Sequence, residues 1–461
     1  MNLSRRRKVY ISFERVRGGA QVLKQTHKKN NKTNFANKSL SQGLYVPVIR
    51  NQVADNHRQL LAEFDRDVWI LLLTRGLRSF SAAILSVCFT IYMSKLGATS
   101  VQLGMMFTGM ALFAALRSLG EGLIADRFGR KPVLLLTTTL MTIGGLIFAL
   151  NQDLRVLTVS AIVFGVGRAM PYTPAEQAML TEKVSSENRT TAFSVNSFIG
   201  TIAAVFGSFA AILPVYLQGR GVVELASYQP VFIIFTLSGL VSTLSFLIIK
   251  ETYQNKLDDE SAENAQITAD ERWILSRWSL VLALDVIGGS FIMNFTSYWF
   301  YVKFGVGLGQ IGTLFGASRI VAAGSLYLGL RLAKGVGTIR ATVLSRVPVV
   351  IINILTPIMP SYIIVAYMRG FMSLFSMIDV PLRQSYLMGM IRSKRKASAA
   401  GIVAVVSRFT AAGAPMLSGY VMQFISIDLP FFLAAGFQLA SASLMYLIFK
   451  DVKPPDEKER T

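Results

Sequence analysis

Twelve apolar runs, each about 20 residues long, follow one another along most of this 461-residue chain. A helix of that length crosses roughly 30 Å of hydrocarbon. Because a backbone inside lipid must satisfy its own hydrogen bonds, such runs are predicted to be helices. We expect an all-α integral membrane protein with twelve transmembrane helices. They are predicted at residues 69–94, 101–125, 132–151, 156–180, 190–217, 230–250, 279–302, 309–330, 342–359, 361–390, 398–424 and 429–450.

Lysine and arginine are concentrated at one end of the predicted helices. The breaks on the side of the N-terminus and both tails are rich in them, whereas the breaks on the other side hold only Lys95, Arg155, Arg220 and Lys303. Since cytoplasmic loops carry the basic excess, both termini are predicted to be cytoplasmic. We expect a multi-pass protein of the cell (plasma) membrane, with an organelle membrane as the alternative. The net charge of +21 then reflects basic tails beside anionic lipid, so the expected partner is the bilayer and no nucleic acid.

Several catalytic classes lack the residues that they need. Cys88 is the single cysteine, and the two histidines, His27 and His57, lie in the N-terminal tail. No phosphate-binding loop is present, and the glycine pattern at 307–312 has no acidic residue about 20 positions later, as a dinucleotide site requires. We therefore expect neither an enzyme nor a protein with a bound metal or cofactor.

The polar segments divide the chain into five parts. Residues 1–66 form a basic cytoplasmic arm that is either disordered or a transit peptide. Two bundles of six helices each are predicted over 67–250 and 278–450. Residues 251–277 form an acidic cytoplasmic linker with helical character at its end, and 451–461 form a short tail.

The two predicted bundles repeat each other in sequence. Identical residues recur about 208 positions apart, and they include polar and proline residues that apolar repetition alone would not align. Such a parallel repeat indicates two bundles related by a pseudo-two-fold axis along the membrane normal. The matched pairs are Lys95 and Lys303, Gly97 and Gly305, Gln102 and Gln310, Gly104 and Gly312, Gly122 and Gly329, Pro174 and Pro381, and Gln177 and Gln384.

A charged break between the second and third runs reads Gly122-x-x-x-Asp126-Arg127-x-Gly129-Arg130-Lys131. It resembles the signature loop of the major facilitator superfamily in sequence, position and sidedness. The stretches "PAEQAMLTEKVSSENRTTAFS" and "DVPLRQSYLMGMI" are also similar to that family. The resemblance covers residues 67–450 and implies its two-bundle transporter fold.

The resemblance implies a conformational latch on the cytoplasmic side, formed by Gly122, Asp126, Gly129, Arg130 and Lys131. Asp126 would face the positive N-terminal end of the eleventh helix, with Arg130 holding its side chain. Gly122 would allow close helix packing, and Gly129 the tight turn. The alternative interpretation is a solvated turn with a basic cluster that stops translocation.

Helices 1, 4, 7 and 10 surround the central cavity in this family. Charged residues are costly against lipid, so those on these helices are expected to line the cavity or to pair. Arg168 is the favoured substrate contact, and Asp379, close to Pro381, is the favoured protonatable coupling group. Arg346 is assigned to a helix end, and Arg117 is expected to pair with Glu121. The predicted substrate or coupling cavity comprises Arg75, Arg78, Arg168, Asp285, Arg369 and Asp379.

Opposite charges occupy equivalent positions of the two bundles. An offset of 207 relates Glu176 to Arg383 and Arg78 to Asp285. Glu176 and Arg383 each follow an aligned proline, and we predict that they meet as a cytoplasmic gate when the cavity closes.

The predicted function is secondary active transport of a small organic solute by alternating access, coupled to a proton gradient and carried out by a monomer. A facilitative uniporter or a non-transporting solute sensor is the alternative. The excess of arginine over acidic residues in the runs favours an anionic or zwitterionic solute. The fifth run lacks the glycine–proline pattern of the family's proton-driven exporters, so the sequence does not decide between uptake and efflux.

Overall fold

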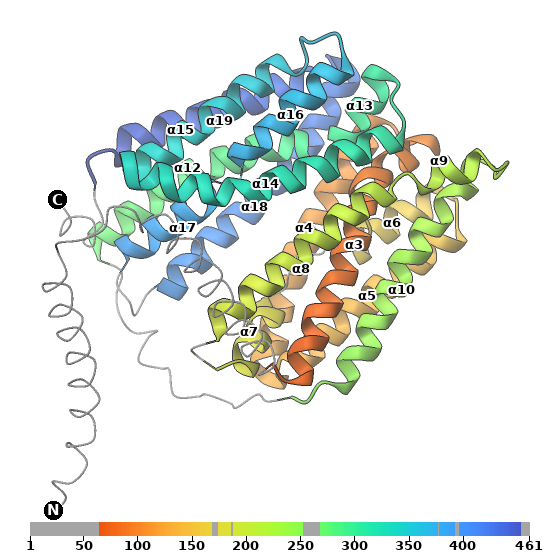
Figure 1. Ribbon diagram of the computed structural model, residues 1–461, viewed down its shortest axis with the longest axis horizontal. Coiled ribbons are helices and arrows are strands. Elements are labelled where there is room, and N and C mark those ends of the chain that lie inside the picture. Colours follow the sequence, from red (N-terminus) through yellow and green to blue (C-terminus); the bar gives the residue numbers. More distant parts are fainter. Residues whose placement is uncertain are drawn as a thin grey trace, which may run out of the picture. The chain divides into compact units, whose positions relative to one another are not determined.

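The computed structural model describes residues 64–167, 174–185, 188–251, 268–376, 378–391 and 396–452, apart from a few side chains within helices. Asp65–Thr461 forms one compact unit. Its described part consists of helices joined by short turns (Figure 1). The predicted basic arm, most of the linker and most of the C-terminal tail lie outside the described residues.

Each half of the compact unit holds six membrane crossings. The first half contains α3 (Arg66–Lys95), α4 (Ser100–Phe128), α5 (Arg130–Leu150), α6 (Leu154–Phe164), α7 (Pro174–Lys183), α8 (Arg189–Ala210), α9 (Leu213–Gln218), the short helix η1 (Ala226–Tyr228) and α10 (Gln229–Ile248). The second half contains α12 (Ala269–Met293), α13 (Thr296–Phe304), α14 (Leu308–Val336), α15 (Thr338–Leu355), α16 (Tyr362–Ser376), α17 (Asp379–Met390), α18 (Lys396–Phe424) and α19 (Leu429–Phe449).

Every predicted apolar run coincides with one helix or with two consecutive helices. Within the described residues, eight helical segments are long and apolar enough to cross a membrane. The fourth run of each half departs from the prediction of one continuous helix. It is divided into α6 and α7 in the first half, and into α16 and α17 in the second. In the first half, Gly165 and Gly167 end the helix with φ values of 72° and 92°.

The helices alternate in direction, so the membrane-spanning unit has two ends. We call the end with Asp65 and Lys450 the tail end, and the end with Lys95 and Leu429 the loop end. In the first half, α3 packs on α8 and α10, and in the second half, α12 packs on α18 and α19 (Figure 1). These are equivalent helix pairs, as a parallel repeat requires.

Residues that recur in the two halves have the same local role. The Oε1 atom of Gln102 accepts a hydrogen bond from the backbone N–H of Thr99, and that of Gln310 accepts one from Gly307. Both glutamines therefore cap the helix that begins beside them. The matched glycines Gly97 and Gly305 both have positive φ, at 94° and 63°.

A second matched pair of glycines joins the halves. A Cβ atom at Gly104 of α4 would lie 2.5 Å from the carbonyl oxygen of Pro415 in α18, and one at Gly312 of α14 would clash with that of Ser208 in α8. Only glycine lets these backbones approach so closely. The halves thus meet along α4 with α18 and along α8 with α14.

Hydrogen bonds between the halves lie on one side of the membrane midplane. Within the described ranges, they are found from about mid-membrane to the loop end. They join Ser86 to Ser297 and Arg319, Thr90 to Asn294, Lys95 to Tyr301, Ser100 to Tyr298, Val101 to Gln423 and Thr108 to Met416.

Candidate functional site

A buried ion pair joins the first and fourth crossings of the first half. The Nη2 atom of Arg78 in α3 lies 2.5 Å from Oε1 of Glu176 in α7. The two side chains are only 3% and 0% exposed. Arg78 also donates to the carbonyl oxygen of Thr74 and lies over the ring of Phe246, 5.6 Å from its centroid. Such a pair keeps both charges compensated inside the membrane.

The second half contains a four-residue ring of alternating charges, which we call the Asp–Arg ring. Arg346 of α15 contacts Asp285 of α12 at 2.7 Å and also contacts Asp379 of α17. Arg383 of α17 contacts the same two carboxylates, at 2.8 Å and 2.6 Å. Each arginine therefore has two acidic partners, and each acid has two arginines. All four side chains are at most 15% exposed.

The two clusters occupy equivalent places with inverted charge. Arg78 corresponds to Asp285 and Glu176 to Arg383, and in each half the paired residues are 98 positions apart. The repeat has therefore kept an ion pair between its first and fourth crossings while exchanging the signs. Asp379 and Arg346 are additions of the second half.

Asp379 has one carboxylate oxygen that is not engaged. Its Oδ2 contacts both arginines. Its Oδ1 is buried and, within the described part of the chain, has no hydrogen-bond partner. A proton on Oδ1 would give this oxygen a hydrogen to donate and would leave the contacts of Oδ2 in place.

The predicted gate residues each have partners in their own half. Glu176 contacts Arg78, and Arg383 contacts Asp285 and Asp379. The predicted contact between Glu176 and Arg383 is not present in this conformation. A gate formed by these two residues stays a prediction for the state in which the tail end closes.

The structure describes the surroundings of only some residues of the predicted latch. Gly129 has a φ of 91° and makes the predicted tight turn between α4 and α5. Arg130 pairs with Glu182 of α7 at 3.2 Å, and the backbone N–H of Lys131 donates to Glu251 at 2.8 Å. These contacts lie within the first half. The side chains of Gly122 and Asp126 lie outside the described residues, so a latch to α18 stays a prediction.

The other predicted cavity residues lie in different surroundings. Arg369 of α16 contacts Oδ1 of Asn353 at 3.5 Å and the ring of Phe431, so it points to the interior of the second half. Arg75 lies beside Gly200 of α8. Arg168 lies outside the described residues.

Two sequence-based assignments have clear outcomes. Arg117 and Glu121 pair along one helix face at 3.1 Å, as predicted. The assignment of Arg346 to a helix end was wrong, because this residue is part of the Asp–Arg ring.

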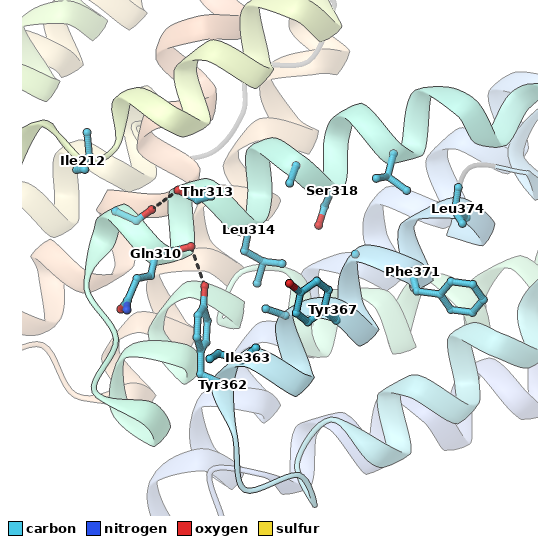
Figure 2. Close-up of a pocket in the computed structure, with 15 residues that line it drawn as sticks. Ile212, Gln310, Thr313, Leu314, Ser318, Tyr362, Ile363, Tyr367, Phe371 and Leu374 are labelled. Carbon is cyan, nitrogen blue, oxygen red and sulfur yellow. Dashed lines mark hydrogen bonds between the residues drawn. The ribbon is translucent and has the colours of Figure 1, made fainter.

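A groove of about 850 Å³ lies between α14 and α16 (Figure 2). Its walls are mostly apolar and include Leu314, Ile363 and Phe371. Near one end, the hydroxyl of Tyr362 donates to the carbonyl oxygen of Gln310 at 2.8 Å. None of the described lining residues is charged. The groove is therefore separate from the Arg78–Glu176 pair and from the Asp–Arg ring.

Comparison with known proteins adds independent information. The family profile described as Major Facilitator Superfamily matches residues 71–367. An uncharacterized membrane protein of Saccharomyces cerevisiae, YJR124C, is 23% identical over 401 residues, which cover 77% of this chain and 87% of the yeast protein.

Two solved structures share the fold. A bacterial homologue of the human lysosomal transporter Spinster, in an inward-facing and occupied conformation, aligns with a TM-score of 0.65 at 16% identity and covers 82% of this chain and 95% of its own. The nucleoside transporter NupG aligns with a TM-score of 0.64 at 14% identity and covers 84% and 100%. At these identities the likeness concerns the fold alone.

Proposed function

Since the chain belongs to the major facilitator superfamily, we propose that it is a secondary active transporter that moves a small organic solute by alternating access, coupled to protons. The fold supplies two halves that can rock against each other around a site between them. The solute and the coupling are the parts of this proposal that need experiment.

The distribution of the described contacts between the halves supports alternating access. The described hydrogen bonds between them lie from mid-membrane to the loop end, as expected when that end is closed. Moving the opening to the other end requires these bonds to break and new ones to form near the tail end. The solved structure of similar fold in an inward-facing conformation is consistent with a state in which the loop end is closed and the tail end is open.

The Asp–Arg ring is the observation that best supports proton coupling. When Asp379 is protonated, Arg346 and Arg383 both retain Asp285 as a charged partner. Protonation takes the ring from a net charge of zero to +1, but both arginines keep a contact with the ionised Asp285, which shares the extra charge between them. We assign that proton to Oδ1 of Asp379, which has no hydrogen-bond partner among the described residues.

Uptake into liposomes from a mixture of small metabolites tests this function and identifies the solute. The purified protein is reconstituted, a pH gradient of either sign is imposed, and the liposomes are incubated with the mixture. Mass spectrometry then compares their content with that of protein-free liposomes. We expect at least one solute to accumulate above its external concentration, and this accumulation to be lost in Asp379→Asn.

The alternatives predict different results. A uniporter would equalise the solute concentrations whatever the pH gradient, and a sensor would move no solute. Exchange between preloaded compartments should survive in Asp379→Asn, because exchange needs no net proton movement. Gradient-driven accumulation that persists in Asp379→Asn would assign the coupling proton to another residue, with Asp285 or Glu176 as the next candidates.

A further inference from the structure

Among the described residues, Arg319 is an arginine that forms a hydrogen bond with the opposite half of the protein. It lies in α14, and its Nη2 atom is 3.4 Å from Oγ of Ser86 in α3 of the first half. Arg319 is 11 residues from Leu308, the start of its helix, or about 16 Å from the loop end. Ser86 is nine residues from Lys95, or about 14 Å from that end. Their contact therefore lies near the middle of the bilayer.

This contact is the described hydrogen bond between the halves that lies farthest from the loop end. Ser297 of α13 reaches the same place, where its hydroxyl donates to the carbonyl oxygen of Ser86 at 3.0 Å. Two described contacts between the halves therefore meet at Ser86. The side chain of Arg319 is only partly buried.

Arg319, like Arg369, has no carboxylate among its described contacts, but Arg369 points to the interior of its own half whereas Arg319 reaches the other half. Arg78, Arg117, Arg346 and Arg383 each contact a carboxylate. The described polar contact of Arg319 is a single long one, to a hydroxyl. A guanidinium has five N–H donors in a planar fork that fits two oxygens of one anion.

The surrounding serines complete a site for an anion. The hydroxyl of Ser86 donates to the carbonyl oxygen of Ala83 at 2.7 Å, so it can turn to donate to a bound oxygen instead. An anion held by Arg319 and Ser86 would contact both halves at once. Its binding would therefore respond to their relative movement, which is what alternating access requires of a substrate.

We propose that Arg319, with Ser86, binds the anionic group of the transported solute, and that this solute is a small organic acid with a carboxylate or a phosphate monoester. This assignment rests on the proposed transport function. It predicts that the oxyanion, and not the uncharged part of the solute, provides the main contact at mid-membrane.

Ligand-induced stabilisation of the purified full-length protein tests the site, because a ligand of the native state raises its apparent melting temperature. The probes are benzoate, succinate and glycerol 3-phosphate, compared with benzamide, succinamide and glycerol at equal ionic strength. We expect at least one anion, but not its uncharged analogue, to stabilise the wild type. The carboxylate and phosphate probes distinguish the two classes of oxyanion.

Variants assign the binding to Arg319. Arg319→Gln should weaken the apparent affinity for the stabilising anion by about tenfold or more, because it removes a charge-assisted hydrogen bond. Arg319→Lys keeps the charge but loses the fork, and should give an intermediate loss. Ser86→Ala should give a smaller loss. The matched control is Arg155→Gln, which removes an exposed arginine at the start of α6 and should bind like the wild type.

Three results would overturn the assignment: no anion stabilises the wild type better than its uncharged analogue, Arg319→Gln binds like Arg155→Gln, or Arg319→Lys binds like the wild type while Ser86→Ala has no effect. If Arg319→Gln does not fold, the wild-type probes, Arg319→Lys and Ser86→Ala still decide. Anion binding without gradient-driven uptake would contradict the proposed transport function alone. Gradient-driven uptake restricted to uncharged solutes would contradict the anion site alone.

Discussion

The two halves of this transporter place charge at equivalent positions in different ways. At these positions the first half has the buried pair of Arg78 with Glu176. The second half has the same pair with inverted signs, Asp285 with Arg383, and adds Arg346 and Asp379 to close a ring. Where the second half has Arg346, the first has Thr139, 207 positions earlier.

This difference favours the second half as the one that changes its charge, because its arginines each contact two carboxylates. Arg78 has Glu176 as its described carboxylate partner, so protonating Glu176 would take away that compensation. In the ring, each arginine contacts two carboxylates, and one carboxylate can be neutralised while the other remains. We infer that the first-half pair stabilises the fold, whereas the second-half ring carries the proton.

Arg78→Gln should have the largest effect. Removing one partner of a buried ion pair takes a compensating charge away from the other, and we expect a loss of about 3–5 kcal/mol of stability. Thermal unfolding in detergent measures it. The exchange Arg78→Glu with Glu176→Arg gives the first half the charge order of the second and should recover most of the loss. A single variant as stable as the wild type would contradict the structural role of this pair.

Arg346→Gln should lower the stability less than Arg78→Gln does. The variant removes the contacts of Arg346 with Asp285 and Asp379, but Arg383 still contacts both carboxylates, so we expect a loss of about 1.5–3 kcal/mol. The same unfolding measurement ranks it against Arg78→Gln. If Arg346→Gln were the more destabilised of the two, the redundancy of the ring would be refuted.

At Gly104 and Gly312 the halves are alike, so the variants Gly104→Ala and Gly312→Ala should behave alike. Each would push a Cβ atom into a backbone carbonyl of the other half, and we expect a loss of about 1–3 kcal/mol from overpacking. The matched control is Gly289→Ala in α12, where a Cβ meets nothing within 4 Å. Losses no greater than in Gly289→Ala would show that close approach at these glycines is not needed.

Much of the architecture follows from the sequence because it depends on local or repeated patterns. The length of the apolar runs predicts the crossings, and the recurrence of Gln102 as Gln310 predicts the equivalence of the halves, with both residues capping a helix. The pairing of Arg117 with Glu121 follows from a spacing of four on one helix.

The partners within the site do not follow from the sequence, because they come from helices that only the packed bundle brings together. Arg346 was misplaced since its helix was expected to begin at residue 342 but begins at Thr338. Eight residues of helix place Arg346 about 12 Å from the helix start, deep enough to reach Asp285 and Asp379. The hydropathy pattern did not predict this start of α15, because polar residues near the start of the helix precede its apolar part.

In the proposed mechanism, protonation of the Asp–Arg ring, and not of the first-half pair, controls the conformation of the protein. Spin labels at Ser185→Cys and Arg340→Cys, exposed positions near the tail end of each half, report the distance between the halves; the native Cys88 is buried. Pulsed electron paramagnetic resonance across a pH series needs no substrate. We predict that the distance distribution changes with pH in the wild type and in Glu176→Gln, and does not change in Asp379→Asn. A pH response that persists in Asp379→Asn and disappears in Glu176→Gln would contradict the assignment of the proton to the ring.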